Sequence, residues 1–433
     1  MKPHEIVKDY KGHPNFGDIC KSASEYARVG YVDEVILRLI ATTYGAVPKK
    51  LEMLQNARPL EIFGRDLIEE SALEQMYTAM KVPVAVRGAL MPDAHLGYAL
   101  PIGGVWVTNN AISPSAVGFD ISCMMHFTVL DITPEDFEKR VDLFTRVLRN
   151  VTSFGVGSDF DTGLREHEVM DESNWNISTK VRSFRSLAQK QLGSSGGGNH
   201  FADIVLTEFG NVGLLTHSGS RGTGHKLATH YIKLAEEYTS RIARGVPKEY
   251  SWLSLDTEEG KEYQSAMRLM GQYALANHEL IHDHFLEQSG LQAVGTIWNR
   301  HNYAWSNPAG QVIHRKGATP ADIGIVGIIP GTCATPAYVV EGVGNPKSIS
   351  SASHGAGRLR SRKDSEKIFK KDVFVETMKK NGVDFYGVAP DESPHAYKNI
   401  EDVMYVQEGV TVNILEKLYP RVVIMGGEAD DGD

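Results

Sequence analysis

The sequence has few cysteines and no long apolar run, although it counts 433 residues. Cys20, Cys123 and Cys333 are too few to build a disulfide framework, which favours a reducing compartment. No apolar stretch approaches the roughly 20 residues that a membrane-spanning helix needs. The N-terminal segment Met1–Tyr10 is polar and lacks the apolar core of a signal peptide. These absences predict a cytoplasmic protein with no membrane partner.

The chain also lacks polar low-complexity runs and an excess of positive charge. Its formal net charge of -9 at pH 7 disfavours binding of nucleic acid through overall attraction, yet it permits a local basic groove. Hydrophobic residues make up 42% of the sequence, which is enough for a sizeable core. The composition therefore indicates a folded globular chain.

Segments typical of helices and strands alternate irregularly, without an internal repeat. Residues 1–60 are typical of a helical N-terminal extension. Thr133, Pro134 and Glu135 favour a helix start, and this helix is expected to reach about Asn150. Other expected helices are Glu34–Ile40, Leu67–Met80, one ending near Gly245, Glu259–Gln288 and Glu366–Lys380; expected strands are Gly104–Thr108, His126–Asp131, Leu214–His217, Ile323–Ile328 and Tyr338–Val340. The irregular alternation predicts a single, complex mixed α/β (α+β) domain.

Several glycine-rich segments carry side chains that can bind metal ions. Asp120 and Cys123 lie three residues apart, so a carboxylate and a thiol can sit on one turn. A thiolate can bridge two cations, and mixed oxygen, sulfur and nitrogen donors suit Mn²⁺, Zn²⁺ or Fe²⁺ better than Ca²⁺ or Mg²⁺. A buried cysteine beside a turn aspartate is the alternative interpretation of this pair.

Three histidines, His200, His217 and His301, each stand in a turn-like setting. Their wide separation prevents sequence spacing from grouping them, so each is open to a structural as well as a metal-binding role. Three glycines precede Asn199 and His200 and allow close approach of a ligand to the backbone. The loop from Ser218 to Gly224 joins a strand to a helix and is either an anion site or an ordinary turn.

His354 lies between Ser353 and the string Gly-Ala-Gly-Arg. Its small neighbours leave the imidazole accessible, and a neutral imidazole nitrogen is a competent nucleophile toward phosphorus. The basic residues Arg358, Arg360, Arg362 and Lys363 follow, either to meet phosphates or to form a solvated face.

A competing pattern, His278-Glu-Leu-Ile-His282, fits the HExxH motif of zinc peptidases. Histidines at i and i+4 share one helix face. The extended metzincin string is missing after His282, and short patterns of this kind match often by chance. We therefore expect the two histidines to lie on a helix away from the metal cluster, with no third ligand nearby.

Taken together and in order, the glycine-rich segments resemble the RtcB family of RNA ligases. The resemblance runs from about Met91 to Tyr397. It is carried by the strings Met91-Pro-Asp-Ala-His-Leu-Gly97, Pro101-Ile-Gly-Gly104, Gly118-Phe-Asp-Ile-Ser-Cys123, Gly196-Gly-Gly-Asn-His-Phe201, His217-Ser-Gly-Ser-Arg-Gly222, His314-Arg-Lys-Gly-Ala318 and His354-Gly-Ala-Gly-Arg358.

The resemblance implies a centre of two Mn²⁺ ions and a GTP-dependent ligase. Asp120, Cys123 and His200 would hold one ion; Cys123, His217 and His301 would hold the other. His354 would become guanylylated, with Asp93 as an acid close to the metals. The implied nucleotide pocket consists of Asn199, His200, Phe201, Asp203, His301, Asn302, Pro330, Gly331, Thr332, Cys333, His354, Gly355, Ala356, Gly357 and Tyr397.

The chain departs from the family pattern where guanine would be recognised. The family tail carries a lysine that contacts the base, whereas Gly426 stands near that position, within a divergent acidic tail (residues 421–433). Asp203 replaces a longer glutamate, and Ala337 replaces a serine. The metal-binding and nucleophile positions match the family.

The implied activity joins RNA 3′-phosphate or 2′,3′-cyclic phosphate ends to 5′-hydroxyl ends through a histidine–GMP intermediate. RNA with such ends is the expected partner, and an archease-like activator is a candidate one. Two alternatives remain: a ligation-dead relative that binds RNA ends with the help of metal, and a zinc peptidase built on His278 and His282.

Overall fold

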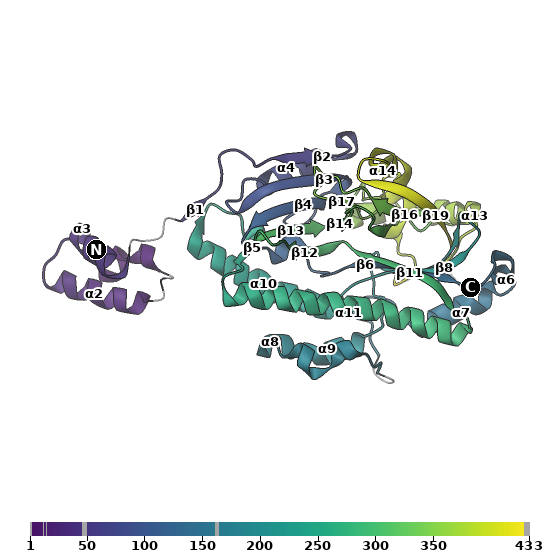
Figure 1. Cartoon of the computed structure of the whole chain (residues 1–433), viewed down its shortest axis with the longest axis horizontal. Coiled ribbons are helices and arrows are strands. Elements are labelled where there is room, and N and C mark those ends of the chain that lie inside the picture. The colour runs from purple at the N-terminus through teal and green to yellow at the C-terminus, as the bar shows by residue number, and fades with distance from the viewer. Residues whose placement is uncertain (1, 12, 14, 46–49, 161–163, 428–433) are drawn as a thin grey trace.

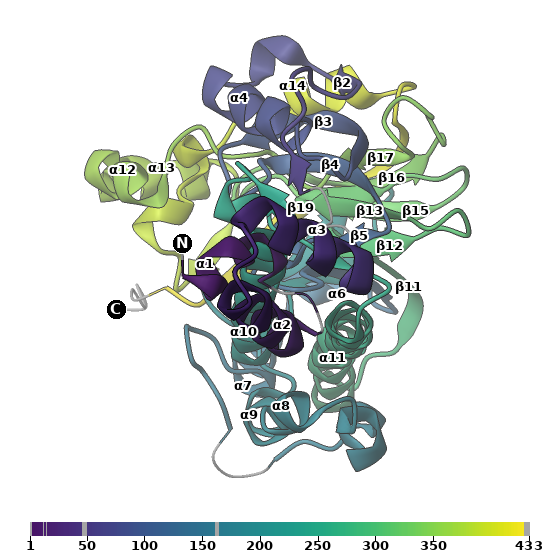
Figure 2. The same cartoon turned by 90° about the vertical axis from the view of Figure 1, so that its left-hand side faces the viewer.

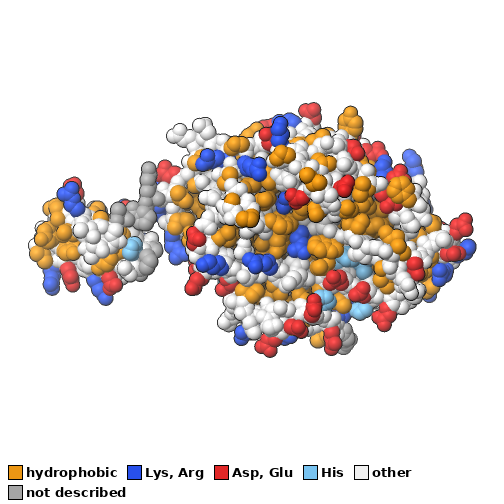
Figure 3. Space-filling view, viewed as in Figure 1, with side chains coloured by type: hydrophobic (Ala, Val, Ile, Leu, Met, Phe, Trp, Pro, Cys, Tyr) orange, Lys and Arg blue, Asp and Glu red, His pale blue; other side chains and the backbone are white. Residues whose placement is uncertain are grey.

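The computed structural model describes residues 2–11, 13, 15–45, 50–160 and 164–427 (Figure 1). The N-terminal helices α1 (Pro3–Ile6), α2 (Phe16–Arg28) and α3 (Asp33–Tyr44) pack around their own small core, which contains Ile19 and Ile36. They form a lobe beside the rest of the molecule (Figure 3). The helix expected at Glu34–Ile40 is therefore confirmed as part of α3.

The largest sheet has eight strands, in the order β11-β6-β8-β7-β19-β16-β15, with β18 paired to β19. All of its neighbouring strands run antiparallel except β18 and β19. Their bounds are β6 Met124–Leu130, β7 Phe201–Thr207, β8 Val212–Ser218, β11 Ala293–Arg300, β15 Val326–Ile329, β16 Ala337–Gly342, β18 Asp384–Tyr386 and β19 Val412–Met425.

The two faces of this sheet are buried against different neighbours. Ala202, Ile204 and Leu214 share a core with Phe144 and Phe285 of the covering helices. The alternate residues of the same strands, among them Val205 and Leu215, belong to a core on the opposite face. Because successive side chains of a strand point to opposite faces, one strand serves both a helix-packed layer and a cavity.

A second, five-stranded sheet has the order β12-β13-β4-β3-β2. Its strands are β2 Leu60–Ile62, β3 Ala85–His95, β4 Ile102–Asn109, β12 Asn302–Ser306 and β13 Gln311–Lys316. Short pairs complete the strands: β1 Leu51–Glu52 with β9 Ala243–Arg244, β5 Ala111–Ile112 with β10 Leu253–Ser254, and β14 Ala318–Pro320 with β17 Ser351–Ser353.

Two long helices, α10 (Arg221–Ile242) and α11 (Glu258–Ser289), run alongside the sheets (Figures 1 and 2). Thr257 caps α11 by accepting a hydrogen bond from the Gly260 amide, and Gly290 ends it in the left-handed conformation. The remaining α-helices described are α4 Glu70–Ala79, α5 Pro114–Val117, α6 Pro134–Glu138, α7 Val141–Val151, α8 Thr179–Arg182, α9 Arg185–Gln191, α12 Arg362–Ile368, α13 Lys371–Lys380 and α14 Ile400–Gln407.

The mixed α/β class was predicted correctly, but some element boundaries were not. The helix expected from Thr133 to Asn150 is two helices, since Arg140 leaves the helical conformation. The helix expected at Glu366–Lys380 is likewise divided at Phe369, which is extended. The strand expected from Ile323 begins only at Val326, because Ile323 is 83% exposed and lies in a turn. Within the described residues, none of the helices is apolar over enough of its length to cross a membrane.

Candidate active site

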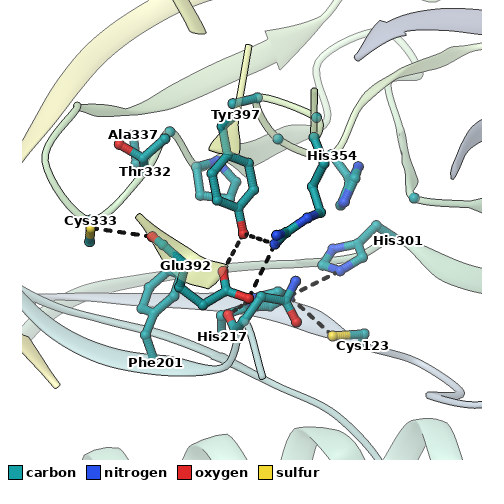
Figure 4. A pocket seen from close by; sticks show the side chains of 18 of the residues that line it. Cys123, Phe201, His217, His301, Thr332, Cys333, Ala337, His354, Glu392 and Tyr397 are labelled. Atoms are coloured by element: carbon teal, nitrogen blue, oxygen red, sulfur yellow. Dashed lines mark hydrogen bonds and ion pairs between the residues drawn. The ribbon is translucent and has the colours of Figure 1, made fainter. Parts of the chain in front are cut away.

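A cavity of about 400 Å³ lies over one face of the large sheet (Figure 4). Strands β7, β8 and β19 supply its floor, and the loops that contain His301, Thr332 and His354 form its walls. The members of the sequence-predicted sites that line it are Asp120, Cys123, Asn199, Phe201, Asp203, His217, His301, Asn302, Pro330, Gly331, Thr332, Cys333, His354, Gly355, Ala356, Gly357 and Tyr397. Residues scattered over almost 280 positions, from Asp120 to Tyr397, thus meet at one hollow.

One end of the cavity brings together a thiol and two imidazoles. The Sγ atom of Cys123 lies 3.4 Å from Nε2 of His200 and 3.1 Å from Nε2 of His217. Within the part of the chain that the structure describes, these three residues are the cluster whose donor atoms lie close enough for one ion. His301 extends it, since its Nε2 is 3.2 Å from Nε2 of His217.

The tautomers of these histidines suit a cation. His200 turns Nδ1 to the carbonyl oxygen of Ser195, and His217 turns Nδ1 to that of Asn199. A carbonyl only accepts hydrogen bonds, so each ring carries a proton on Nδ1. In His217 the lone pair of Nε2 is thereby directed toward Cys123, whereas Nε2 of His200 also lies 2.9 Å from Asp120, to which it donates when protonated. Burial, and next the charge of His200, lower the pKa of His217 to about 3, which keeps this ring neutral.

Asp120 completes this end of the cavity. Its Oδ2 lies 2.9 Å from Nε2 of His200, and its Oδ1 accepts a hydrogen bond from the Ser220 amide. Burial raises the pKa of Asp120, but the hydrogen bond and charge of His200 outweigh burial and lower it to about 2. Burial and the charge of Asp120 hold the pKa of the Cys123 thiol well above its usual value. A bound cation would reverse this, because it favours the thiolate. The donor set therefore fits a transition metal.

The opposite wall holds His354 against a buried carboxylate. Nδ1 of His354 is 2.8 Å from Oδ2 of Asp93, and the same oxygen accepts the His354 amide at 3.2 Å. Burial raises the pKa of Asp93, but the hydrogen bond and charge of His354, with the charge of Lys398, outweigh burial and lower this pKa. The ionised carboxylate fixes the proton on Nδ1, which leaves Nε2 as the basic, nucleophilic nitrogen. The rings of His301 and His354 are 5.0 Å apart, so this nitrogen lies near the metal-capable cluster.

Two predicted site residues lie behind the cavity wall instead of lining it. Asp93 is fully buried and acts on the cavity through His354. His200 is also buried and approaches the cavity through Cys123 and Asp120. Asn302 lines the cavity, but its amide is engaged: Nδ2 donates to the Asp120 carbonyl and Oδ1 accepts the Gly317 amide. The amide of Asn302 therefore already supports the loop of Asp120.

Asp203 occupies the part of the cavity floor formed by β7 and β19. It is 6% exposed, and its Oδ1 has no hydrogen-bond partner within the described part of the protein. Burial raises the pKa of Asp203 well above its usual value, opposed by a hydrogen bond from the Ile424 amide. A buried carboxyl with a free oxygen can pair with the N–H groups of a bound base.

Two departures from the family pattern lie on or directly after strands next to this floor: Ala337 on β16, which pairs with β19, and Gly426, which follows β19. Ala337, on β16, lines the cavity without a hydroxyl. Gly426 has no room for a side chain, because an added Cβ would lie 2.4 Å from the Gly155 nitrogen and 2.5 Å from the Gly196 oxygen. The residues that would read a base are thus fewer than the family pattern has.

Among the cavity residues that sequence reasoning missed, Lys316 and Glu392 are charged. Lys316 is buried, and its Nζ donates to the carbonyl oxygens of Tyr98 and Ser115. Burial lowers the pKa of Lys316 to about 7. Lys316 could have been found from the sequence, because it belongs to the string His314-Arg-Lys-Gly-Ala318 that carries the resemblance.

Arg358 and Arg362, two members of the basic run, also line the cavity. Both contact Glu392, whose carboxylate also accepts the hydroxyl of Tyr397. Arg360 and Lys363 are exposed. Nothing in the local sequence marks Glu392, since its arginine partners lie about 30 residues earlier in the chain.

The structure bears on two further sequence-based interpretations. At the loop before α10, the Ser220 amide donates to Asp120, so this turn holds a carboxylate of the protein in place of a free anion. His278 and His282 lie on α11 as expected, and each of their four ring nitrogens has a protein partner. The ring of His126 lies 4.2 Å from that of His282, but within the described residues these histidines form no group whose donor atoms could share one ion, as expected. Glu279 pairs with His167, away from an HExxH-type site.

The fold and cavity define a mixed α/β protein with a cysteine–histidine centre that can hold metal beside a polarised histidine. The model of the family described as tRNA-splicing ligase RtcB matches residues 75–426. The chain belongs to this family.

Curated relatives agree over most of their length. The chain is similar to the RNA-splicing ligase RtcB of Escherichia coli K12, with 30% identity over 388 residues that cover 83% of this chain and 95% of the relative. The tRNA-splicing ligase RtcB of Methanococcus maripaludis is 29% identical, covering 83% and 92%. That of Nanoarchaeum equitans is 28% identical, covering 91% and 100%.

Replacing Cys123 with alanine is expected to weaken binding of Mn²⁺ at least tenfold. The substitution removes the sulfur atom that Nε2 of His200 and Nε2 of His217 both face. Bound metal in dialysed protein, measured by atomic spectroscopy, checks this. Cys333→Ala is the matched control, since Cys333 lines the same cavity with its thiol directed to the Glu392 carbonyl. Equal metal content in the two variants would contradict the expectation.

Asp203→Asn is expected to stabilise the nucleotide-free protein increasingly as the pH rises. The folded protein keeps the Asp203 proton to a higher pH than the unfolded chain, which loses it near pH 3.9. Stability contributed by Asp203 is therefore present below that pH and is lost as the pH rises toward the folded pKa. Tm measured from pH 4 to 8 should show a growing advantage for Asp203→Asn, but not for the exposed Asp402→Asn. If the Tm difference between Asp203→Asn and the natural protein does not change with pH, the expectation that Asp203 is buried in its protonated form is refuted.

Proposed function

We propose that this chain is a GTP- and Mn²⁺-dependent RNA ligase that joins 3′-phosphate or 2′,3′-cyclic phosphate ends to 5′-hydroxyl ends through a guanylylated His354. The observation that carries the proposal is the hydrogen bond from Nδ1 of His354 to the buried Asp93, in a cavity shared with the Cys123 cluster. Family membership and the names of the relatives supply the reaction class.

Cys123, His200, His217, His301 and Asp120 are the proposed ligands of two Mn²⁺ ions. Mixed thiolate, imidazole and carboxylate donors suit such an ion, and Cys123 lies between the imidazoles of His200 and His217. When bound, the metal would neutralise phosphate charge and so lower the barrier to an in-line displacement.

In the proposed reaction, the lone pair of His354 Nε2 attacks the α-phosphorus of GTP. The bond to the pyrophosphate oxygen breaks, and Asp93 stabilises the ring as it gains positive charge. An oxygen of the RNA 3′-phosphate then displaces His354 from phosphorus, so that GMP becomes attached to the RNA end. The RNA 5′-hydroxyl attacks the 3′-phosphate, loses its proton and releases GMP. A 2′,3′-cyclic end is opened by water to the 3′-phosphate first.

The remaining cavity residues have positioning roles in this proposal. Asn199, Phe201, Asp203 and Tyr397 are proposed to surround the nucleotide. The other proposed members of the pocket are His301, Asn302, Pro330, Gly331, Thr332, Cys333, Gly355, Ala356 and Gly357, together with His200 behind the cavity wall. Arg358 and Arg362 lie where they can exchange Glu392 for phosphate.

The organisation of the whole chain follows the same proposal. We assign a single ligase domain, with the separately packed N-terminal helices as an extension and RNA as the macromolecular partner. An archease-like activator and a cytoplasmic location complete the assignment, the latter supported by three cysteines without disulfide bonds. The segment Arg421–Met425 of the divergent tail lies within β19, and residues 428–433 lie outside the described part.

Replacement of His354 by alanine is expected to abolish the protein–GMP adduct, because the attacking nitrogen is lost. Incubation with Mn²⁺ and α-labelled GTP should give an acid-labile, alkali-stable adduct on the natural protein. His395→Ala, which removes an exposed histidine, should retain the adduct. Metal content of His354→Ala should stay close to that of the natural protein.

An adduct on His354→Ala would place the nucleophile elsewhere and overturn the mechanism. A natural protein that binds Mn²⁺ and 3′-phosphorylated RNA without forming an adduct would instead identify a ligation-dead relative.

Selectivity for GTP over ATP is expected to be modest. The absent tail lysine and the absent hydroxyl at Ala337 remove two hydrogen bonds of about 1 kcal/mol each, which together correspond to roughly thirtyfold in selectivity. Competition between labelled GTP and unlabelled ATP in the adduct assay measures the preference. A GTP preference of several thousandfold would contradict this expectation.

A further inference from the structure

A row of polar side chains is buried between the large sheet and α11, on the face opposite the cavity. Thr128 of β6 and Thr216 of β8 point toward this helix, where His278 and His282 share one face. All four are at most 2% exposed. The proposed reaction uses none of them, and the resemblance to zinc peptidases does not account for them.

The row is connected by hydrogen bonds at every step. Thr128 Oγ1 is 2.8 Å from His282 Nδ1, and Thr216 Oγ1 is 2.8 Å from His282 Nε2. Thr216 Oγ1 is also 2.6 Å from His278 Nδ1, and His278 Nε2 is 3.3 Å from the carbonyl oxygen of Ser218. The row thus leads from the middle of β6 to the residue that follows His217.

Chemistry fixes the direction of each bond in the row. The Ser218 carbonyl can only accept, so His278 carries its proton on Nε2. Burial keeps the pKa of His278 well below its usual value, so the ring is neutral and its Nδ1 accepts the Thr216 hydroxyl. Thr216 can then only accept from His282 Nε2, and His282 Nδ1 accepts the Thr128 hydroxyl.

The chain of bonds continues into the metal-capable cluster. Ser218 Oγ donates to the Ser195 carbonyl at 2.7 Å, and the same carbonyl accepts Nδ1 of His200. Beside His278, Asn277 donates to the Gly219 carbonyl and accepts the Gly193 amide. Both backbone segments that position the proposed ligands His200 and His217 are therefore tied to α11.

We propose that Thr216, His278 and His282 are positioning residues, which through this one-directional chain of hydrogen bonds hold β8 and set the imidazoles of His200 and His217 for metal binding. The inference rests on the proposed metal-dependent function. It assigns the His278-Glu-Leu-Ile-His282 pattern to the support of a metal centre on the other side of the sheet.

Thr216→Val and Thr216→Ser form a matched pair for the test. Valine keeps the shape of threonine but removes the hydroxyl, so His278 Nδ1 and His282 Nε2 lose their common partner. Serine keeps the hydroxyl. Binding of Mn²⁺, followed by electron paramagnetic resonance of the free ion, should weaken roughly 10–100-fold in Thr216→Val and return close to the natural value in Thr216→Ser.

The tautomers supply a second measurement, which requires neither metal nor activity. Long-range ¹H–¹⁵N spectra of the metal-free natural protein at pH 7 should show His278 and His282 protonated on Nε2, and His200 and His217 protonated on Nδ1. Signals are assigned with single histidine-to-glutamine variants. If Thr216→Val fails to fold, Thr128→Val replaces it, with the same expected weakening from the far end of the row.

The outcomes separate this inference from the proposed function. A natural protein that does not bind Mn²⁺ would refute the proposed function. A natural protein that binds Mn²⁺, together with a Thr216→Val variant of equal affinity, would refute the positioning chain alone. A proton on Nδ1 of His278 in the natural protein would also refute it, since the direction of the bonds would then be reversed.

Discussion

The register of three antiparallel strands determines where every other part of the centre lies. Met125 of β6 stands opposite His217 of β8, which in turn stands opposite Phe201 of β7. Because side chains alternate along a strand, this register directs His217 into the cavity and its neighbour Thr216 toward α11. If β8 slipped by one residue against its neighbours, Thr216 would point into the cavity and His217 would point toward α11. The hydrogen bonds of Thr216 to the helix histidines therefore oppose a slip that would also dismantle the cavity.

Two buried carboxyls, one behind the cavity wall and one on the cavity floor, show how hydrogen-bond and charge partners determine ionisation. Asp93 and Asp203 are both almost inaccessible to water. Asp93 faces His354 and Lys398, which favour its ionised form, whereas Asp203 receives a single hydrogen bond from a backbone amide. His354, the proposed nucleophile, therefore faces a carboxylate that favours its ionised form, whereas Asp203 favours its neutral form. Burial by itself would raise the pKa of both carboxyls.

Features with local causes could be predicted from the sequence, and features with distant causes could not. The helix start at Thr133 follows from adjacent residues, and the pairing of Asp120 with Cys123 follows from a spacing of three. The grouping of His200, His217 and His301 needs strand pairing, so it came from the resemblance and not from spacing. The HExxH pattern shows the limit most clearly, because its partners Thr128 and Thr216 lie on strands 60 to 150 residues away. Glu392 was missed for the same reason.

The crowding around Gly426 limits which substitutions the chain accommodates there. The Gly155 nitrogen and the Gly196 oxygen occupy the space that a side chain would need. A lysine at this position would thus require the loops of Gly155 and Gly196 to move together, so no single substitution of Gly426 places a side chain there without rearranging the backbone. Substitutions at Ala337 and Asp203, which line the cavity, change its lining without such a rearrangement.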